Sequence, residues 1–169
     1  MNKIIGLLCL LLCPSIGYAQ SPTVSFPIEI QQKIKKGIPI IDQNNKPILT
    51  FYYTEVVDGD TVKGYLEHLP STLNHVSIRV KGIDTPEMPQ HAKCEKEGQL
   101  ALKAKAFTND YMEHHKQLII TETEWDKYGG RIVGNIKSND NNSLTDELIK
   151  AGFGKAYKGK GSKPNWCKN

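Results

Sequence analysis

The chain has 169 residues, of which 38% are hydrophobic and 24% charged, and its formal net charge is +4 at neutral pH. It holds no internal repeat and no low-complexity tract, and after the first 19 residues it has no apolar run of the ~20 residues that a membrane-spanning helix needs. This length and composition predict one mildly basic domain with a real hydrophobic core.

The first 19 residues have the features of a secretory signal peptide. Lys3 supplies a positive charge, residues 4–13 form an apolar stretch, and residues 17–19 (GYA) place small residues at a cleavage site. We therefore expect an exported protein, periplasmic or secreted, that begins near Gln20 and has no stable membrane association after cleavage. Loss of Lys3 lowers the net charge to +3.

Residues 20–47 are predicted to form an extended leader, because four prolines interrupt its short apolar pieces. The domain itself is expected to cover residues 48–169. Residues 48–57 are rich in β-branched and aromatic side chains and predict a strand. An Asp-Gly-Asp turn at residues 58–60 then leads into a second strand at residues 61–66.

A third strand is predicted at residues 76–83, after a polar loop at residues 67–75. Ile78 and Val80 face one side of this strand and Arg79 the other. The clearest helix follows at residues 95–115.

The helix prediction depends on one apolar stripe. Leu100, Ala104, Phe107 and Tyr111 recur at helical spacing. Such a stripe is typical of a helix that packs on a core.

Two more strands are predicted at residues 118–123 and 131–137. Ser143 is a candidate N-cap with Asp146 three residues later, as in a capping box, and Gly152 is expected to end this second helix. Five short strands with helices outside them match an α+β fold, a five-stranded OB-type Greek-key β-barrel with about three packed α-helices.

Carboxylates and an arginine lie together at the ends of two predicted strands. Asp60, Asp84 and Glu87 offer hard oxygen ligands of the kind that bind Ca²⁺ or Mg²⁺. Arg79 offers a planar, charged fork that fits a phosphate. Because carboxylates alone would repel a nucleic acid, this combination predicts a metal between protein and phosphate. It outlines a metal-assisted phosphodiesterase site.

Three motifs carry a family resemblance. Residues 57–62 (VDGDTV), 83–87 (IDTPE) and 126–131 (DKYGGR) resemble, in this order, the staphylococcal nuclease (thermonuclease) family. The similarity runs from about residue 54 to about residue 157. It implies an OB-type barrel and a calcium-dependent endonuclease with one Ca²⁺ that acts on DNA and RNA, single strands being preferred. We also expect a monomer.

The resemblance and the residues assign the same metal site. Asp60, Asp84 and the backbone carbonyl of Thr85 are the expected Ca²⁺ ligands, and Glu87 is the expected general base or water-positioning group. Asp58 is expected either to close the turn or to lie beside the metal ligands.

Arg79 and Arg131 are the two arginines of the whole chain, and both fall in motifs, whereas lysines carry the bulk charge. Both are expected to bind the phosphate and stabilise its transition state. A surface salt bridge is the alternative for Arg131, which follows two glycines where the family pattern has one.

Lys127, Tyr128 and Tyr157 match positions that contact the nucleotide in the family. Lys158 belongs to a C-terminal stretch, residues 151–169, with five lysines and no acid. Aromatic residues among lysines, here Tyr157 and Trp166, suit stacking on bases, although a basic stretch is also typical of an ordinary solvated face.

Four cysteines are present, and Cys9 and Cys13 would leave with the signal peptide. The remaining pair, Cys94 and Cys167, favours a disulfide in an exported protein, with two free thiols as the alternative. The bridge would fasten the C-terminal segment to the loop after Glu87.

An endonuclease is the function these residues favour. The alternative is an OB-fold module that binds nucleic acid with little or no catalysis. A binding module does not need carboxylates beside its phosphate groove, whereas this chain has Asp60, Asp84 and Glu87 beside its arginines.

Overall fold

A computed structural model of the chain describes residues 41, 45, 48–67, 69–115, 118–127 and 129–168. The predicted signal peptide and nearly all of the predicted leader lie outside these residues. Among the residues described, no helix is long and apolar enough to cross a membrane.

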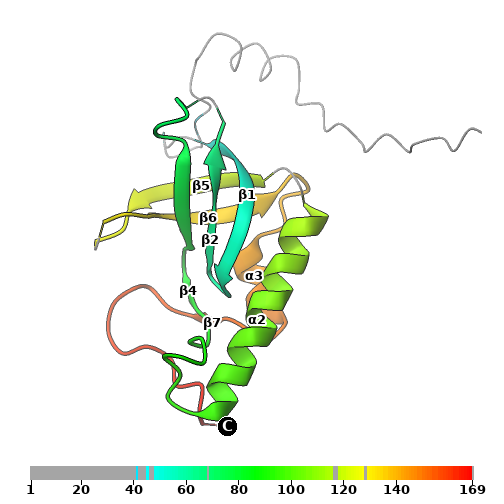
Figure 1. The fold of residues 1–169 in the computed structure, drawn as a ribbon, viewed down its shortest axis with the longest axis vertical. Helices are drawn as coiled ribbons and strands as arrows, with labels where there is room; N and C mark the ends of the chain where they lie inside the picture. The colour runs from blue at the N-terminus through cyan, green and yellow to red at the C-terminus, as the bar shows by residue number, and fades with distance from the viewer. Residues whose placement is uncertain are drawn as a thin grey trace, which may run out of the picture.

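Five strands close into a barrel with the order β1-β2-β3-β6-β5 (Figure 1). Their bounds are β1 Leu49–Asp58, β2 Thr61–Leu66, β3 His75–Val80, β5 Leu118–Trp125 and β6 Ile132–Ser138. Neighbouring strands are antiparallel except β3 and β6, which are parallel. This confirms the predicted α+β fold with an OB-type barrel. After β3 the chain crosses over to β5, and β6 then pairs with both β5 and β3 and closes the barrel.

The barrel interior is apolar and has no access to solvent. Fully buried side chains from all five strands fill it: Phe51, Val62, Ile78, Ile120 and Ile136. Alternate residues of a strand point to opposite faces, so the residues next to these in sequence point out of the barrel. Arg79 on β3 is one of them.

The predicted third strand is wrong in one respect, since the structure divides it in two. β3 ends at Val80, and Gly82 has a φ of 84°, a left-handed conformation that glycine adopts at little cost. The chain then forms a separate short strand, β4 (Ile83–Asp84), which pairs with β7 (Lys155–Ala156) in a two-stranded sheet. The break carries Asp84 out of the barrel wall and next to the C-terminal segment.

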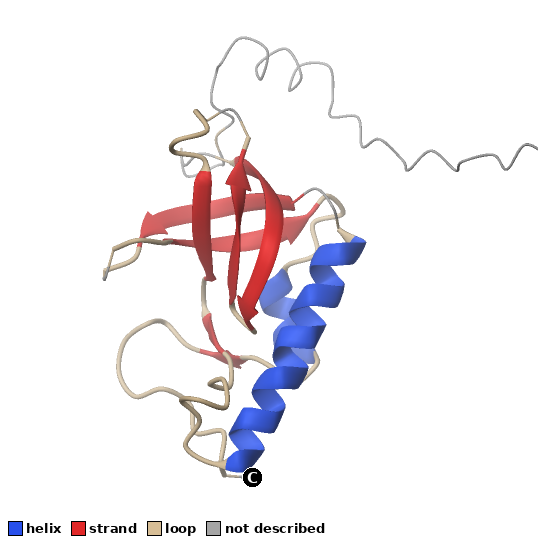
Figure 2. Ribbon diagram, viewed as in Figure 1, coloured by secondary structure: helices blue, strands red, loops and turns tan. Residues whose placement is uncertain are grey.

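The described part of the chain has two helices, α2 (Glu95–His114) and α3 (Leu144–Lys150), where the sequence predicted about three. The long helix agrees with its predicted bounds. It packs along β1, and α3 contacts β6 and α2 (Figure 2). The residue pattern located two helices only; the third belonged to the general description of the fold.

The second helix begins as predicted but without the capping box. Ser143 is its N-cap, yet the Ser143 hydroxyl donates to Asn135 Oδ1 at 3.0 Å and makes no cap hydrogen bond. The tertiary contact with β6 replaces the local one. Gly152 follows the helix with a φ of 77°, as expected for a glycine that ends a helix.

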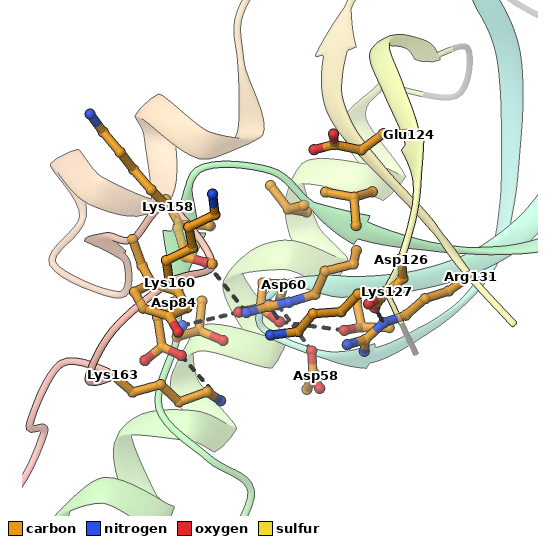
Figure 3. Close-up of a pocket in the computed structure, with 18 of the residues that line it drawn as sticks. Asp58, Asp60, Asp84, Glu124, Asp126, Lys127, Arg131, Lys158, Lys160 and Lys163 are labelled. Carbon is orange, nitrogen blue, oxygen red and sulfur yellow. Dashed lines mark hydrogen bonds and ion pairs between the residues drawn. The ribbon is translucent and has the colours of Figure 1, made fainter. Parts of the chain in front are cut away.

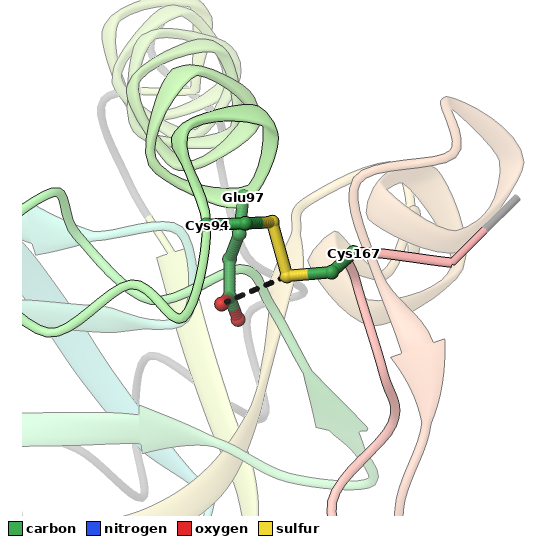
Figure 4. A group of neighbouring side chains, drawn as sticks. All are labelled: Cys94, Glu97 and Cys167. Carbon is green, nitrogen blue, oxygen red and sulfur yellow. Dashed lines mark hydrogen bonds between the residues drawn. A yellow bond between two sulfur atoms is a disulfide. The ribbon is translucent and has the colours of Figure 1, made fainter.

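A disulfide joins Cys94, directly before α2, to Cys167 near the C-terminus, with the Cα atoms 6.1 Å apart (Figure 4). The predicted bridge is confirmed. Glu97 lies 3.9 Å from the Cys167 sulfur, and these three side chains could form a metal trio only if the thiols were free. In the structure the two cysteines are bonded to each other and fasten the C-terminal segment to the start of α2.

Reduction of this disulfide should lower the melting temperature of the protein produced without residues 1–19. The bridge joins residues 73 apart, so the chain-entropy model assigns it ~4 kcal/mol and a shift of roughly 10 °C. Calorimetry with and without reductant measures the shift. Mass spectrometry after alkylation supplies the control, since two alkylated cysteines before reduction would contradict the bridge.

Candidate active site

A cleft of about 660 Å³ lies between one end of the barrel and the C-terminal segment (Figure 3). Its walls come from the β1–β2 turn, β3, β4 with the loop after it, the β5–β6 connection and the segment after β7. The structure brings these predicted site residues together in its lining: Asp60, Arg79, Asp84, Thr85, Glu87, Lys127, Arg131, Tyr157 and Lys158. Tyr128, predicted to contact the nucleotide, lies outside the described residues.

The Asp-Gly-Asp turn is held by a hydrogen bond within the turn and by contacts with helix α2. Asp58 Oδ1 accepts the backbone N–H of Asp60 at 3.0 Å, so Asp58 closes the turn. The Gly59 carbonyl accepts the Thr108 hydroxyl of α2 at 2.7 Å. A Cβ at Gly59 would lie 2.9 Å from the Ala104 Cβ, which leaves room for glycine alone.

Asp60 joins two of the sequence motifs. Its side chain is buried, and Oδ2 accepts the backbone N–H of Thr85 at 3.0 Å. Its other oxygen, Oδ1, forms an ion pair with Arg79 Nη1. One carboxylate thus fixes the turn, β3 and the loop after β4 relative to one another.

Arg79 reaches the cleft from β3 with only 15% of its side chain exposed. Its Nη2 donates to the Ile83 carbonyl at 3.3 Å, which holds the guanidinium beside β4. Burial lowers the pKa of Arg79, while the charges of Asp58 and Asp84 raise it. Burial raises the pKa of Asp58, although the Thr61 hydrogen bond and the charge of Arg79 act to lower it.

Asp84 and Glu87 share a cation from the C-terminal segment. Asp84 is 2% exposed, its Oδ2 accepts the indole N–H of Trp166 at 3.0 Å, and its Oδ1 lies 3.3 Å from Lys163 Nζ. The same ammonium lies 2.5 Å from Glu87 Oε1. Burial opposes the charged form of Lys163, but its hydrogen bonds to Glu87 and Asp84 and their negative charges together raise its pKa.

A buried glutamate that the sequence did not single out supports this loop. Glu97 in the first turn of α2 is 2% exposed. Its carboxylate accepts the backbone N–H of Lys93 at 2.7 Å and that of Glu87 at 3.5 Å. An acid in the first turn of a helix is usually an exposed residue that favours the helix dipole, so no sequence signal marked it.

Arg131 occupies the opposite side of the cleft, on the β5–β6 connection. Its Nε forms an ion pair with Asp126 Oδ2, while Gly129 and Gly130 have φ values of 73° and 75°. Both glycines adopt the left-handed conformation, so the extra glycine is absorbed in a tight turn. Arg131 therefore lines the cleft, where a phosphate could bind, and also forms the salt bridge that was the alternative expectation for it.

The aromatic residues differ from expectation. Trp166 is only 4% exposed, and Lys155 Nζ covers its ring at 4.2 Å from the centroid. The interpretation of Trp166 as a base-stacking residue is therefore wrong, since neither its face nor its N–H is free. Trp125, which the sequence did not single out, lines the cleft with 76% of its surface exposed, and Tyr157 lines it half-buried.

The acids of the cleft offer the ligand type that a hard divalent cation prefers. Asp60 in the β1–β2 turn and Asp84 at the end of β4 present carboxylate oxygens, and the Asp60–Thr85 hydrogen bond holds these two segments together. An ammonium, Lys163 Nζ, already lies against Asp84 and Glu87, so this group of oxygens attracts a cation in the structure itself. Ca²⁺ and Mg²⁺ prefer ligands of this type.

The OB barrel is a fold found in proteins that bind oligonucleotides or oligosaccharides, and acids beside arginines are the residue types of metal-assisted phosphoester sites. The sequence model of the family described as staphylococcal nuclease homologue matches residues 77–167, more than half of the chain. The chain therefore belongs to the staphylococcal nuclease homologue family, a family of nucleases and nucleic-acid-binding proteins.

No curated protein matches the chain. The family match includes Arg79, Asp84, Glu87 and Arg131 but begins after Asp60. The structure connects Asp60 to the matched part of the chain, because its carboxylate accepts a hydrogen bond from the Thr85 backbone N–H.

Replacement of Glu97 by alanine should destabilise the fold and disturb the loop that carries Glu87. Two backbone N–H groups would lose their acceptor, which costs about 1–3 kcal/mol in the free energy of unfolding. Urea denaturation measures this change. The matched control is Glu95→Ala, an exposed acid on the same helical turn, for which a change within about 0.5 kcal/mol is expected. Equal effects would show that the Glu97 hydrogen bonds contribute nothing specific.

Proposed function

We propose that this protein is an exported, calcium-dependent endonuclease that hydrolyses phosphodiester bonds in DNA and RNA. The observation that carries the proposal is the Asp60–Thr85 hydrogen bond with its Arg79 ion pair. It gathers carboxylates and arginine from distant motifs in one cleft. A structural protein would have no use for this arrangement.

A phosphodiester resists hydrolysis because its negative charge repels nucleophiles and its leaving group is poor. Asp60, Asp84 and the Thr85 carbonyl are the groups that would hold Ca²⁺, which when bound neutralises charge on the phosphate. The arginines would each contact phosphate oxygens and stabilise the added charge of the five-coordinate transition state.

Glu87, next to the proposed metal ligands Asp84 and Thr85, is suited to act as general base. Its side chain is 39% exposed, so water can reach it, whereas Asp60 and Asp84 are buried. Its carboxylate would orient the attacking water and accept its proton as the new P–O bond forms. The P–O bond to the 5′ oxygen breaks, which leaves a 3′-phosphate, and the leaving oxygen takes up a proton from solvent. The Glu97 hydrogen bond to the Glu87 backbone fixes the loop from which Glu87 acts.

The rim of the cleft supports a preference for single strands. Trp125 exposes an indole beside Lys127, and Lys158 and Tyr157 line the opposite wall. A base can stack on an exposed indole only when it is not paired, while lysines attract the backbone. Export is supported by the signal-like N-terminus and by the disulfide, which forms in oxidising compartments.

The processed protein should cleave single-stranded DNA and RNA in Ca²⁺, cleave duplex DNA more slowly, and lose activity when a chelator removes the ion. Gel analysis of labelled oligonucleotides measures the rates, and products with 3′-phosphate ends are expected. Cleavage that survives thorough metal removal would contradict the metal site. Binding without cleavage in Ca²⁺ would instead identify a nucleic-acid-binding module.

Arg79→Lys and Arg131→Lys should each reduce turnover about 100- to 1000-fold while weakening substrate binding only modestly. Both variants keep the charge but lose the planar fork, which is the loss of one oxyanion-type donor. Steady-state kinetics separates kcat from KM. Lys158→Gln is the comparison, since it should raise KM more than it lowers kcat and should reduce the salt dependence of binding. Equal losses of kcat in all three would mean that the catalytic centre lies elsewhere.

A further inference from the structure

The C-terminal segment forms one wall of the cleft and is held there by several unrelated contacts. The β4–β7 pairing places Lys155 opposite Asp84, and the Tyr157 N–H donates to the Gly82 carbonyl at 2.9 Å. At its far end, Cys167 is bonded to Cys94 at the start of α2. The segment between these anchors therefore has a fixed course past the acidic side of the cleft.

Within this segment, Lys163 points its ammonium at the acidic group (Figure 3). Nζ lies 3.3 Å from Asp84 Oδ1 and 2.5 Å from Glu87 Oε1. Lys158 and Lys160 line the same cleft, but the ion pairs described for the carboxylates of Asp84 and Glu87 are with Lys163.

The buried Asp84 has two partners from this segment, and they act differently. Trp166 donates a neutral hydrogen bond to Oδ2 from a buried indole, which fixes the orientation of the carboxylate. Lys163 brings a charge to Oδ1, the oxygen left for a metal ion. A divalent cation and an ammonium repel each other at contact distance, so they cannot share this oxygen.

We propose that Lys163, which Glu87 holds beside Asp84, competes with the divalent cation for the Asp84 carboxylate and so sets the affinity of the site for Ca²⁺. This inference rests on the calcium site of the proposed function. The ion displaces the ammonium, while Trp166 keeps the carboxylate in its orientation. The lysine has somewhere to go, because 47% of its side chain is exposed and its four-carbon stem is flexible.

Calcium affinity of the processed, oxidised protein tests this directly, with isothermal titration calorimetry and no substrate present. Lys163→Met should bind Ca²⁺ about two- to fivefold more tightly than the wild type, since a partly exposed ion pair no longer opposes the ion. Lys163→Arg keeps the charge and should stay near the wild-type affinity. Lys160→Met removes the same charge from the same cleft and should change the affinity by less than about twofold.

A spectroscopic readout checks that the ion reaches Asp84. Trp125→Phe leaves Trp166 as the one tryptophan of the chain, and its indole is bonded to Asp84. Its fluorescence should change on Ca²⁺ addition with the same midpoint as calorimetry, and at lower Ca²⁺ when Lys163→Met is added. An intact disulfide and an unchanged melting temperature show that the variants fold.

The outcomes separate the two proposals. If the wild type binds Ca²⁺ and Lys163→Met matches Lys160→Met, Lys163 does not compete and the inference is wrong. If neither the wild type nor Lys163→Met binds Ca²⁺, the calcium site fails, and both proposals fail with it. A Lys163→Met variant that binds Ca²⁺ more weakly than the wild type would also overturn the inference, because it would make the lysine a support for the site.

Discussion

The carboxylate of Asp60 is buried next to a guanidinium, and the rest of the site depends on how it is satisfied. A buried charge is tolerated only with hydrogen bonds and a partner of opposite sign. Asp60 obtains the hydrogen bond from the Thr85 backbone and the partner from Arg79. The first bond fixes the loop that carries Glu87, and the second holds Arg79 in the cleft. Removal of this one carboxylate would leave a buried arginine unpaired and release the loop.

The barrel and α2 make this arrangement rigid. Gly59 lies so close to Ala104 of α2 that no side chain fits between them, and the Thr108 hydroxyl binds the same turn. Further along the helix, Glu97 holds the backbone of Glu87. One helix thus positions both the turn before the first predicted metal ligand and the loop of the predicted base.

Much of this could be predicted from the sequence, because strand alternation and the three motifs are local patterns. The failures have tertiary causes. Residues 76–83 alternate like one strand, but Gly82 breaks the strand and β4 pairs with distant β7. Trp166 has the sequence surroundings of an exposed residue and is buried by its contacts with Asp84 and Lys155. Trp125 enters the cleft because β5 continues past an irregularity at Glu122, where φ is 54°.

The acids that would hold the ion or act as base, and the acid beside Arg131, already have cationic partners supplied by the chain. Asp60 is paired with Arg79, Asp84 and Glu87 share Lys163, and Asp126 is paired with Arg131. A fold balanced in this way does not require a metal ion to offset buried charge. On the function proposed above, an ion that binds Asp60 and Asp84 leaves their partners, Arg79 and Lys163, in excess within the same cleft. Excess positive charge attracts a phosphate group, so the bound ion would strengthen substrate binding. By linkage, bound substrate would strengthen ion binding by an equal factor. The pairing of acids with arginine and lysine then serves two states, a stable protein without the ion and a phosphate site with it.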